Sequence, residues 1–236
     1  MENIQFAISV LWCIFGYALY YFLSVRFSPS GKHWNFLTGS DPLVKNVVVS
    51  RIRGFFLFGF IPFLIMIAYR KMPAEFGLGF SFSSYPPWYT VLLFPLIAVL
   101  SYYQARSVSH QAQYPQIRRK RWNRRILLLN AGSWIIFLTG YEILFRGLLL
   151  FSSLQVMETW LAVTINCILY TLAHFHKKPI EIAGVIPVGA VLCYLTVYTG
   201  NIWSAVILHS AMALSNEWFS LRAHPDIMID NNNPVT

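Results

Sequence analysis

Glu142, Arg146, His174 and His209 are ionisable side chains inside apolar segments of this chain. An ionisable residue inside a membrane span costs roughly 2.5–3.5 kcal/mol, so such residues are functional candidates. Glu142 and Arg146 are four residues apart, which places them on one helix face where they can pair. A carboxylate and two imidazoles are groups that carry out general acid–base catalysis. The alternative is a structural ion pair with two histidines bonded inside a helix bundle.

The spacing of these residues predicts that they converge. If the two apolar segments that carry Glu142 and His174 form an antiparallel hairpin turning near Glu158, each residue is 16 positions from the turn. At 1.5 Å per residue, both then lie about 24 Å from the outer surface. His209 is about nine residues into the last apolar segment, near the midplane. We therefore predict one buried polar site.

The composition makes these few charges conspicuous. The chain has 236 residues, of which 56% are hydrophobic and 11% charged, with a mean hydropathy of +0.52. Soluble domains carry about 25% charged residues, so a soluble globule is excluded. The same composition excludes a disordered chain and a collagen-like repeat, and the three cysteines are too few and too far apart for a disulfide scaffold. The chain is predicted to be an all-α, polytopic integral membrane helical bundle.

Seven apolar segments are the candidate membrane spans. A span needs about 20 mostly apolar residues to cross the hydrocarbon core. The first segment has neither a basic flank nor a cleavage site, so we expect an uncleaved helix. We expect Arg51 and Arg53 to snorkel from the end of the second. The prediction is about seven transmembrane helices, at residues 3–25, 47–69, 88–103, 128–154, 159–177, 182–198 and 202–219.

The basic residues predict the orientation. With seven helices, fifteen of the eighteen Lys and Arg residues fall on one side, two on the other, and Arg146 inside a span. The positive-inside rule then places the N-terminus outside and the C-terminus in the cytoplasm. We expect the basic stretch 118–125 to contact anionic lipid headgroups rather than nucleic acid. The expected organisation is N-terminal transmembrane helices and a basic cytoplasmic loop in 1–125, a motif core in 126–219, and a polar cytoplasmic tail in 220–236.

Three segments of the motif core resemble a known family. They are Gly-Tyr-Glu-Ile-Leu-Phe-Arg-Gly at 140–147, Tyr-Thr-Leu-Ala-His at 170–174, and Thr-Gly-Asn-Ile-Trp-Ser-Ala-Val-Ile-Leu-His at 199–209. In order and spacing they are similar to the motifs of the CPBP family, the CAAX prenyl endopeptidase and bacteriocin-processing intramembrane proteins, which include lysostaphin-resistance-like members. The resemblance covers 138–217 and includes Lys-Pro-Ile-Glu at 178–181. It implies an integral protein of a bacterial or archaeal cell membrane.

The resemblance also implies a mechanism. In active members, a Glu-Glu-xxx-Arg motif supplies a glutamate that, with the first motif histidine, activates a water to attack a peptide carbonyl. A later histidine, and an asparagine four residues after it, stabilise the oxyanion. By this resemblance His174 would be the base or its partner, His209 an oxyanion donor, and Arg146 would orient Glu142.

The sequence departs from the family pattern at two positions. Tyr141 replaces the first glutamate, and Ala213 replaces the asparagine. Neighbouring helical residues point about 100° apart, so Glu142 does not simply take the missing position. A tyrosine can donate a hydrogen bond to an oxyanion, but with an ordinary pKa of about 10 it is a poor base. Asn216, seven residues after His209, is the remaining candidate amide, roughly 10 Å further along the helix.

We expect no cofactor and no metal. His174 and His176 are two residues apart and would point to nearly opposite sides of a helix. The sequence has no His-Glu-x-x-His zinc motif. The alternative is a catalytic zinc held by Glu142, His174 and His209, which are ligand types that zinc accepts.

The leading hypothesis is an enzyme, a CPBP-like intramembrane endopeptidase that cleaves a membrane-associated peptide or protein by Glu/His-assisted water attack. The alternative is a catalytically inactive family member that acts as a membrane binding, immunity or assembly factor. Tyr141 is the residue that separates the two. A third interpretation, a transporter using the buried cluster for proton coupling, is disfavoured because no inverted repeat is evident.

Overall fold

The computed structural model describes residues 1–26, 38, 41–80, 85–175 and 179–230. His176, Lys177, Lys178 and the last six residues of the polar tail, which the sequence analysis mentions, lie outside the described residues. The described chain is almost entirely helical, with a single pair of two-residue strands. It is an all-α helical membrane protein, as predicted.

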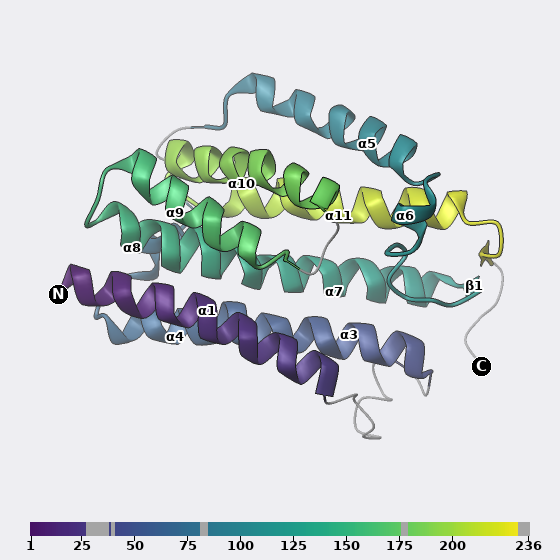
Figure 1. Cartoon of the computed structure of the whole chain (residues 1–236), viewed down its shortest axis with the longest axis horizontal. Helices are drawn as coiled ribbons and strands as arrows, with labels where there is room; N and C mark the ends of the chain where they lie inside the picture. Colours follow the sequence, from purple (N-terminus) through teal and green to yellow (C-terminus); the bar gives the residue numbers. More distant parts are fainter. Residues whose placement is uncertain (27–37, 39–40, 81–84, 176–178, 231–236) are drawn as a thin grey trace.

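Within the described residues, seven long helical segments correspond to the seven expected spans (Figure 1). Four are long and apolar enough to cross a membrane, and the segments Trp88–Gln104 and Thr159–Leu172 are shorter and apolar. Two of the segments contain π-helical stretches, labelled η2 and η5. The bounds are α1 (Glu2–Arg26); α3 (Pro42–Phe55), η2 (Phe56–Phe60) and α4 (Ile61–Ala68); η4 (Trp88–Leu92) and α5 (Leu93–Gln104); α7 (Arg124–Glu142), η5 (Ile143–Leu150) and α8 (Phe151–Leu154); α9 (Thr159–Leu172); α10 (Pro179–Thr199); and α11 (Trp203–Ala223).

Successive segments run back and forth along the long axis of the molecule. The N-terminus lies at one end, and the basic connection before α7 lies with the end of α11 at the other (Figure 1). Short elements occupy the connections, namely η3 (Pro73–Phe76), α6 (Val108–Gln111), β1 (Arg121–Trp122) and β2 (Met228–Ile229).

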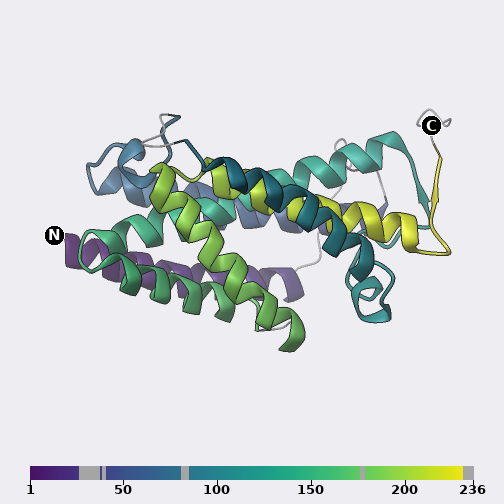
Figure 2. The ribbon, with the colours of Figure 1, turned by 90° about the horizontal axis from the view of Figure 1, so that it is seen from above.

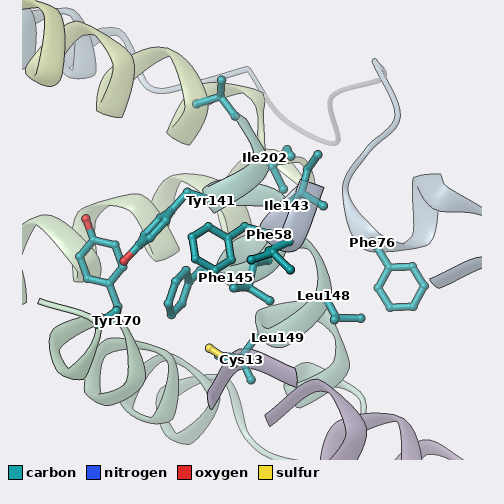
Figure 3. Close-up of a cluster of buried hydrophobic side chains, with 14 of the residues drawn as sticks. Cys13, Phe58, Phe76, Tyr141, Ile143, Phe145, Leu148, Leu149, Tyr170 and Ile202 are labelled. Atoms are coloured by element: carbon teal, nitrogen blue, oxygen red, sulfur yellow. The ribbon is translucent and has the colours of Figure 1, made fainter. Parts of the chain in front are cut away.

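An aromatic and aliphatic core joins α1, η2, η5 and α9 (Figure 3). Its buried members include Phe58, Phe145 and Tyr170. The helices α7 and η2 approach each other closely, because a Cβ added at Gly59 would lie 2.9 Å from the Cα of Gly140. Glycine at both positions is what allows the second segment to pack against the fourth.

We call the end of the bundle that carries the basic connection before α7 the basic end. A parallel pairing of β1 with β2 closes it. Trp122 of β1 is fully buried in a cluster that includes Val44 and Leu221. Arg119, just before β1, pairs with Asp41, which caps α3. These contacts tie the loop before α7 to both α3 and the chain after α11.

The helix α5 crosses α11 on the outside of the bundle (Figure 2). Ser101 of α5 donates a hydrogen bond of 2.8 Å to the side-chain oxygen of Asn216 in α11. The rings of Tyr102 and Phe219 meet edge to face, with centroids 5.8 Å apart. The inner side of α11 packs against α7 and carries the histidine described next.

Candidate active site

Three separate segments supply the candidate residues. Tyr141 and Glu142 end α7, where the chain passes into the π-helix η5 that holds Arg146. Single π-helical stretches within α-helices occur frequently at functional sites. The Phe145 carbonyl in η5 accepts a 2.6 Å hydrogen bond from the Asn166 amide of α9, which satisfies a buried backbone acceptor of this irregular turn.

Glu142 sits between a histidine and an arginine. Its Oε1 accepts a hydrogen bond of 2.6 Å from His209 Nδ1, and its Oε2 lies 3.3 Å from Arg146 Nε. Glu142 and Arg146 are fully buried, and His209 is 7% exposed. The pair predicted from the i, i+4 spacing is therefore present, and both carboxylate oxygens face a cationic or donor group.

Arg146 is held by α10 and α9 as well as by Glu142. Its Nη2 donates to the Gly189 carbonyl at 3.2 Å, and its guanidinium lies 4.4 Å from the ring centroid of Tyr170. Its Nη1 has no hydrogen-bond partner among the described residues. Such contacts offset part of the cost of burying the arginine, with the cation on an aromatic face and next to a carboxylate.

His174 follows the end of α9, and a backbone carbonyl fixes its ring. Nδ1 lies 2.8 Å from the Tyr170 carbonyl oxygen. Because a carbonyl can only accept, Nδ1 carries the proton of the neutral ring and Nε2 carries the lone pair. The ring faces Tyr141 and Tyr170, at centroid distances of 6.1 and 4.9 Å.

Tyr141 lies between the two histidines. Its ring centroid is 6.1 Å from that of His174 and 5.9 Å from that of His209, and both rings stand nearly perpendicular to it. It packs beside Phe145 and Tyr170 in the core (Figure 3). The side chain is 4% exposed, and its hydroxyl has no hydrogen-bond partner within the described residues. Tyr141 thus places a buried hydroxyl without a hydrogen-bond partner among the described residues on a ring that faces both histidines.

The two positions downstream of His209 do not join the polar cluster in the same way. Ala213 is buried with Trp134 and Leu138 in an apolar group between α7 and α11. Asn216 has its amide oxygen bonded to Ser101 of α5, on the side where α5 crosses α11. The contacts of Asn216 therefore belong to the packing of α5.

The residues proposed as alternative zinc ligands meet through hydrogen bonds and aromatic rings. In the part of the chain that the structure describes, no group of three or more His, Cys, Asp and Glu side chains is arranged to hold a metal ion. Glu142 contacts His209, whereas His174 is bonded to a backbone carbonyl.

A second buried charge cluster, absent from the sequence analysis, lies nearer the basic end. Arg51 was expected to snorkel, which is wrong: it is 3% exposed, and its Nη2 lies 3.4 Å from the Oε1 of buried Glu217. Its Nη1 donates to Asn130 and Ser133 at 2.9 Å each. Arg51 does not reach the membrane surface because its side chain is covered by residues of α7 and α11. The available signal was Glu217 itself, an acidic residue eight positions after His209 on the same helix.

The fold and the site define a class of protein: an all-α integral membrane protein with carboxylate, guanidinium and imidazole groups gathered inside its bundle. Residues 122–215 match the family model described as Rce1-like, type II CAAX prenyl endopeptidase Rce1-like. The match covers less than half of the chain, so this region, residues 122–215, is similar to the CAAX-protease-like intramembrane peptidases. Comparisons with curated proteins and with solved structures find no significant match.

Proposed function

We propose that the protein is an intramembrane endopeptidase that hydrolyses a membrane-associated peptide or protein segment. The observation that carries this proposal is the convergence of side chains from three motif segments. His174, after the end of α9, and His209 of α11 both face the ring of Tyr141, and Glu142 at the end of α7 contacts His209.

In this proposal His174 is the general base. Its Nδ1–H is held by a backbone carbonyl, so Nε2 can take a proton from water as the water oxygen attacks the substrate carbonyl. A hydrogen bond that fixes the tautomer of a base is the role of the carboxylate in the Ser-His-Asp triad. Here a carbonyl oxygen does the same for His174.

Groups on the His209 side of the Tyr141 ring would stabilise the oxyanion that develops on the substrate carbonyl oxygen. The Tyr141 hydroxyl is a donor with no other partner among the described residues, and the ring of His209 faces the same tyrosine. Donors fixed in a water-poor site stabilise such charge strongly. Glu142 would hold His209 in place through its Nδ1 contact, while Arg146 orients Glu142.

The experiment compares wild-type protein with variants in lipid bilayers, using a library of membrane peptides. Cleavage by wild type that is lost in both His174→Ala and Glu142→Gln supports the peptidase. Ser101→Ala, which removes a contact of α5 away from the cluster, is the matched control and should keep cleavage. Cleavage that persists in His174→Ala contradicts the proposed base.

A second candidate is a catalytically inactive relative that binds a membrane peptide or protein. Two observations favour it: both oxygens of Glu142 face other side chains, and Ala213 is packed against apolar groups. This candidate predicts no hydrolysis under any condition, together with peptide binding that His174→Ala leaves intact.

We further propose that the basic end faces the cytoplasm of a bacterial or archaeal cell, and that it contacts anionic lipid headgroups. Within 118–125, Arg118 donates hydrogen bonds to backbone carbonyls, and Arg119 forms an ion pair with Asp41. We therefore assign headgroup contact to the exposed basic residues of the stretch other than Arg118, namely Lys120, Arg121 and Arg124. Replacing these three by glutamine should abolish the thermal stabilisation that phosphatidylglycerol gives the purified protein; stabilisation that is unchanged would contradict the assignment.

A further inference from the structure

Two polar contacts join α7 to α11 at matching positions. Glu142 accepts from His209 at 2.6 Å, and Trp134 Nε1 donates to Glu217 Oε1 at 3.0 Å. The second contact lies eight residues earlier in α7 and eight residues later in α11. For antiparallel helices, equal and opposite offsets mean that both contacts belong to one register, about 12 Å apart along the axis.

A buried apolar cluster lies midway between these two contacts. It contains Leu138, four residues before Glu142, and Ala213, four residues after His209. The residues of the two polar contacts and of this cluster are therefore spaced by four along each helix, which is the spacing at which side chains of a helix lie above one another. An alanine and a leucine discriminate poorly between neighbouring registers, so the polar contacts must select the register.

Glu217 is the centre of a network that involves three helices. Its Oε1 receives Trp134 Nε1 of α7, the backbone N–H of Gln116 at 3.1 Å, and Arg51 of α3 at 3.4 Å. Arg51 in turn donates to Asn130 of α7, and its guanidinium lies 4.1 Å from the ring centroid of Trp134. A buried cation of α3 therefore binds α7, and its carboxylate partner, which belongs to α11, binds α7 as well.

We propose that the Arg51–Glu217 network is a positioning element that fixes α11 in the one register where His209 meets Glu142. A slip of one residue would move α11 by about 1.5 Å and turn its side chains by about 100°. The 2.6 Å contact of His209 with Glu142 does not survive such a change. A slip would also leave Arg51 and Glu217 buried without each other, which is strongly unfavourable, and fixing register is the best-attested use of buried polar groups. The catalytic consequence rests on the proposed function, whereas the register does not.

Disulfide crosslinking measures the register directly. In a variant lacking Cys13, Cys167 and Cys193, the pair Leu138→Cys/Ala213→Cys reports the observed register, and Leu138→Cys/Leu214→Cys reports a one-residue slip. Oxidation with copper–phenanthroline removes two protons and two electrons from the thiols and transfers the electrons to oxygen. We expect the first pair to form its disulfide faster than the second, and this preference to be lost on adding Glu217→Gln.

Nuclear magnetic resonance of ¹⁵N-labelled histidines gives a second readout, with His209 assigned by comparison with His209→Gln. We expect Glu217→Gln to shift the His209 Nδ1 signal although it touches neither His209 nor Glu142. A merely structural role would reduce the folded fraction and leave that signal unchanged in the protein that folds. Asp41→Asn, which removes an ion pair at the same end but away from α11, is the matched control and should shift neither readout.

The neutral double variant Arg51→Met/Glu217→Leu keeps the test decisive if Glu217→Gln does not fold, because it removes both charges together. Retention of the crosslinking preference and of the His209 signal in a folded variant would overturn the proposal. Neither readout needs peptide cleavage, so failure of the peptidase proposal and failure of the register proposal are separate results.

Discussion

Replacing Tyr141 by phenylalanine removes one buried hydroxyl and leaves the ring in place. That hydroxyl has no hydrogen-bond partner among the described residues, and its side chain is 4% exposed. Burying a hydroxyl without a partner costs about 1–3 kcal/mol by protein mutational data. We therefore expect Tyr141→Phe to raise the free energy of unfolding by about 1–3 kcal/mol. For a protein of this size, each kcal/mol corresponds to about 2–4 °C in Tm.

The same substitution should reduce cleavage while it stabilises the protein. If the Tyr141 hydroxyl is an oxyanion donor, its loss lowers kcat by about 10²–10³-fold, the effect of removing one such donor. Tryptophan fluorescence during thermal unfolding in nanodiscs measures stability, and peptide hydrolysis in the same preparation measures kcat.

The matched control is Tyr69→Phe. The Tyr69 hydroxyl donates to the Gln5 carbonyl at 3.1 Å, so its removal should lower stability by about 0.5–1.5 kcal/mol and leave cleavage unchanged. A fall in the Tm of Tyr141→Phe would show that its hydroxyl is bonded in the folded protein. A stabilised Tyr141→Phe that cleaves as fast as wild type would refute the donor role.

Three further predictions concern packing, charge and orientation. Gly140→Ala places a Cβ 3.0 Å from the Cα of a facing helix and should lower the free energy of unfolding by about 1–3 kcal/mol. Gly132→Ala in the same helix meets nothing within 4 Å and should raise it by about 0.5–1 kcal/mol. Urea unfolding compares the two variants. Arg146→Met leaves Glu142 buried without its arginine and should lower the free energy of unfolding by about 3–5 kcal/mol. The double variant Arg146→Met/Glu142→Gln should lose less. Equal losses in the single and the double variant would contradict the pairing. A cysteine at Glu2, in a chain without other cysteines, should react with a membrane-impermeant maleimide in intact cells, while one in the C-terminal tail should react only after permeabilisation; the reverse pattern would invert the orientation.

The helical segments could be predicted because the thickness of a bilayer fixes the length of an apolar run, and four of those that the structure describes are long and apolar enough to cross a membrane. The Glu142–Arg146 pair was equally accessible, since it depends on spacing within one helix. The π-helical turns and the approach of Gly59 to Gly140 were not, because they depend on how one helix packs against another. No periodicity within a single segment encodes that packing.

The arrangement of the site was predictable only in part, for the same reason. Depth arithmetic placed Glu142 level with His174, but depth does not determine which side chains touch. In the structure Glu142 bonds to His209, and His174 meets Tyr141. Arg51 was misassigned because an arginine near the end of an apolar run usually reaches water, and only the neighbouring helices show that this one is covered.

The helix α11 has a consequence for biogenesis. It supplies His209 and Glu217, and within the described residues it is not among the four helices that are long and apolar enough to cross a membrane. Its polar groups contact Glu142 and Trp134 of α7 and Arg51 of α3, which lowers the cost of placing them in lipid. We therefore expect entry of α11 into the bilayer to be coupled to docking on α7. The segment that completes the polar site is the one whose insertion depends on the rest of the bundle, so an immature chain without that bundle cannot carry an assembled centre.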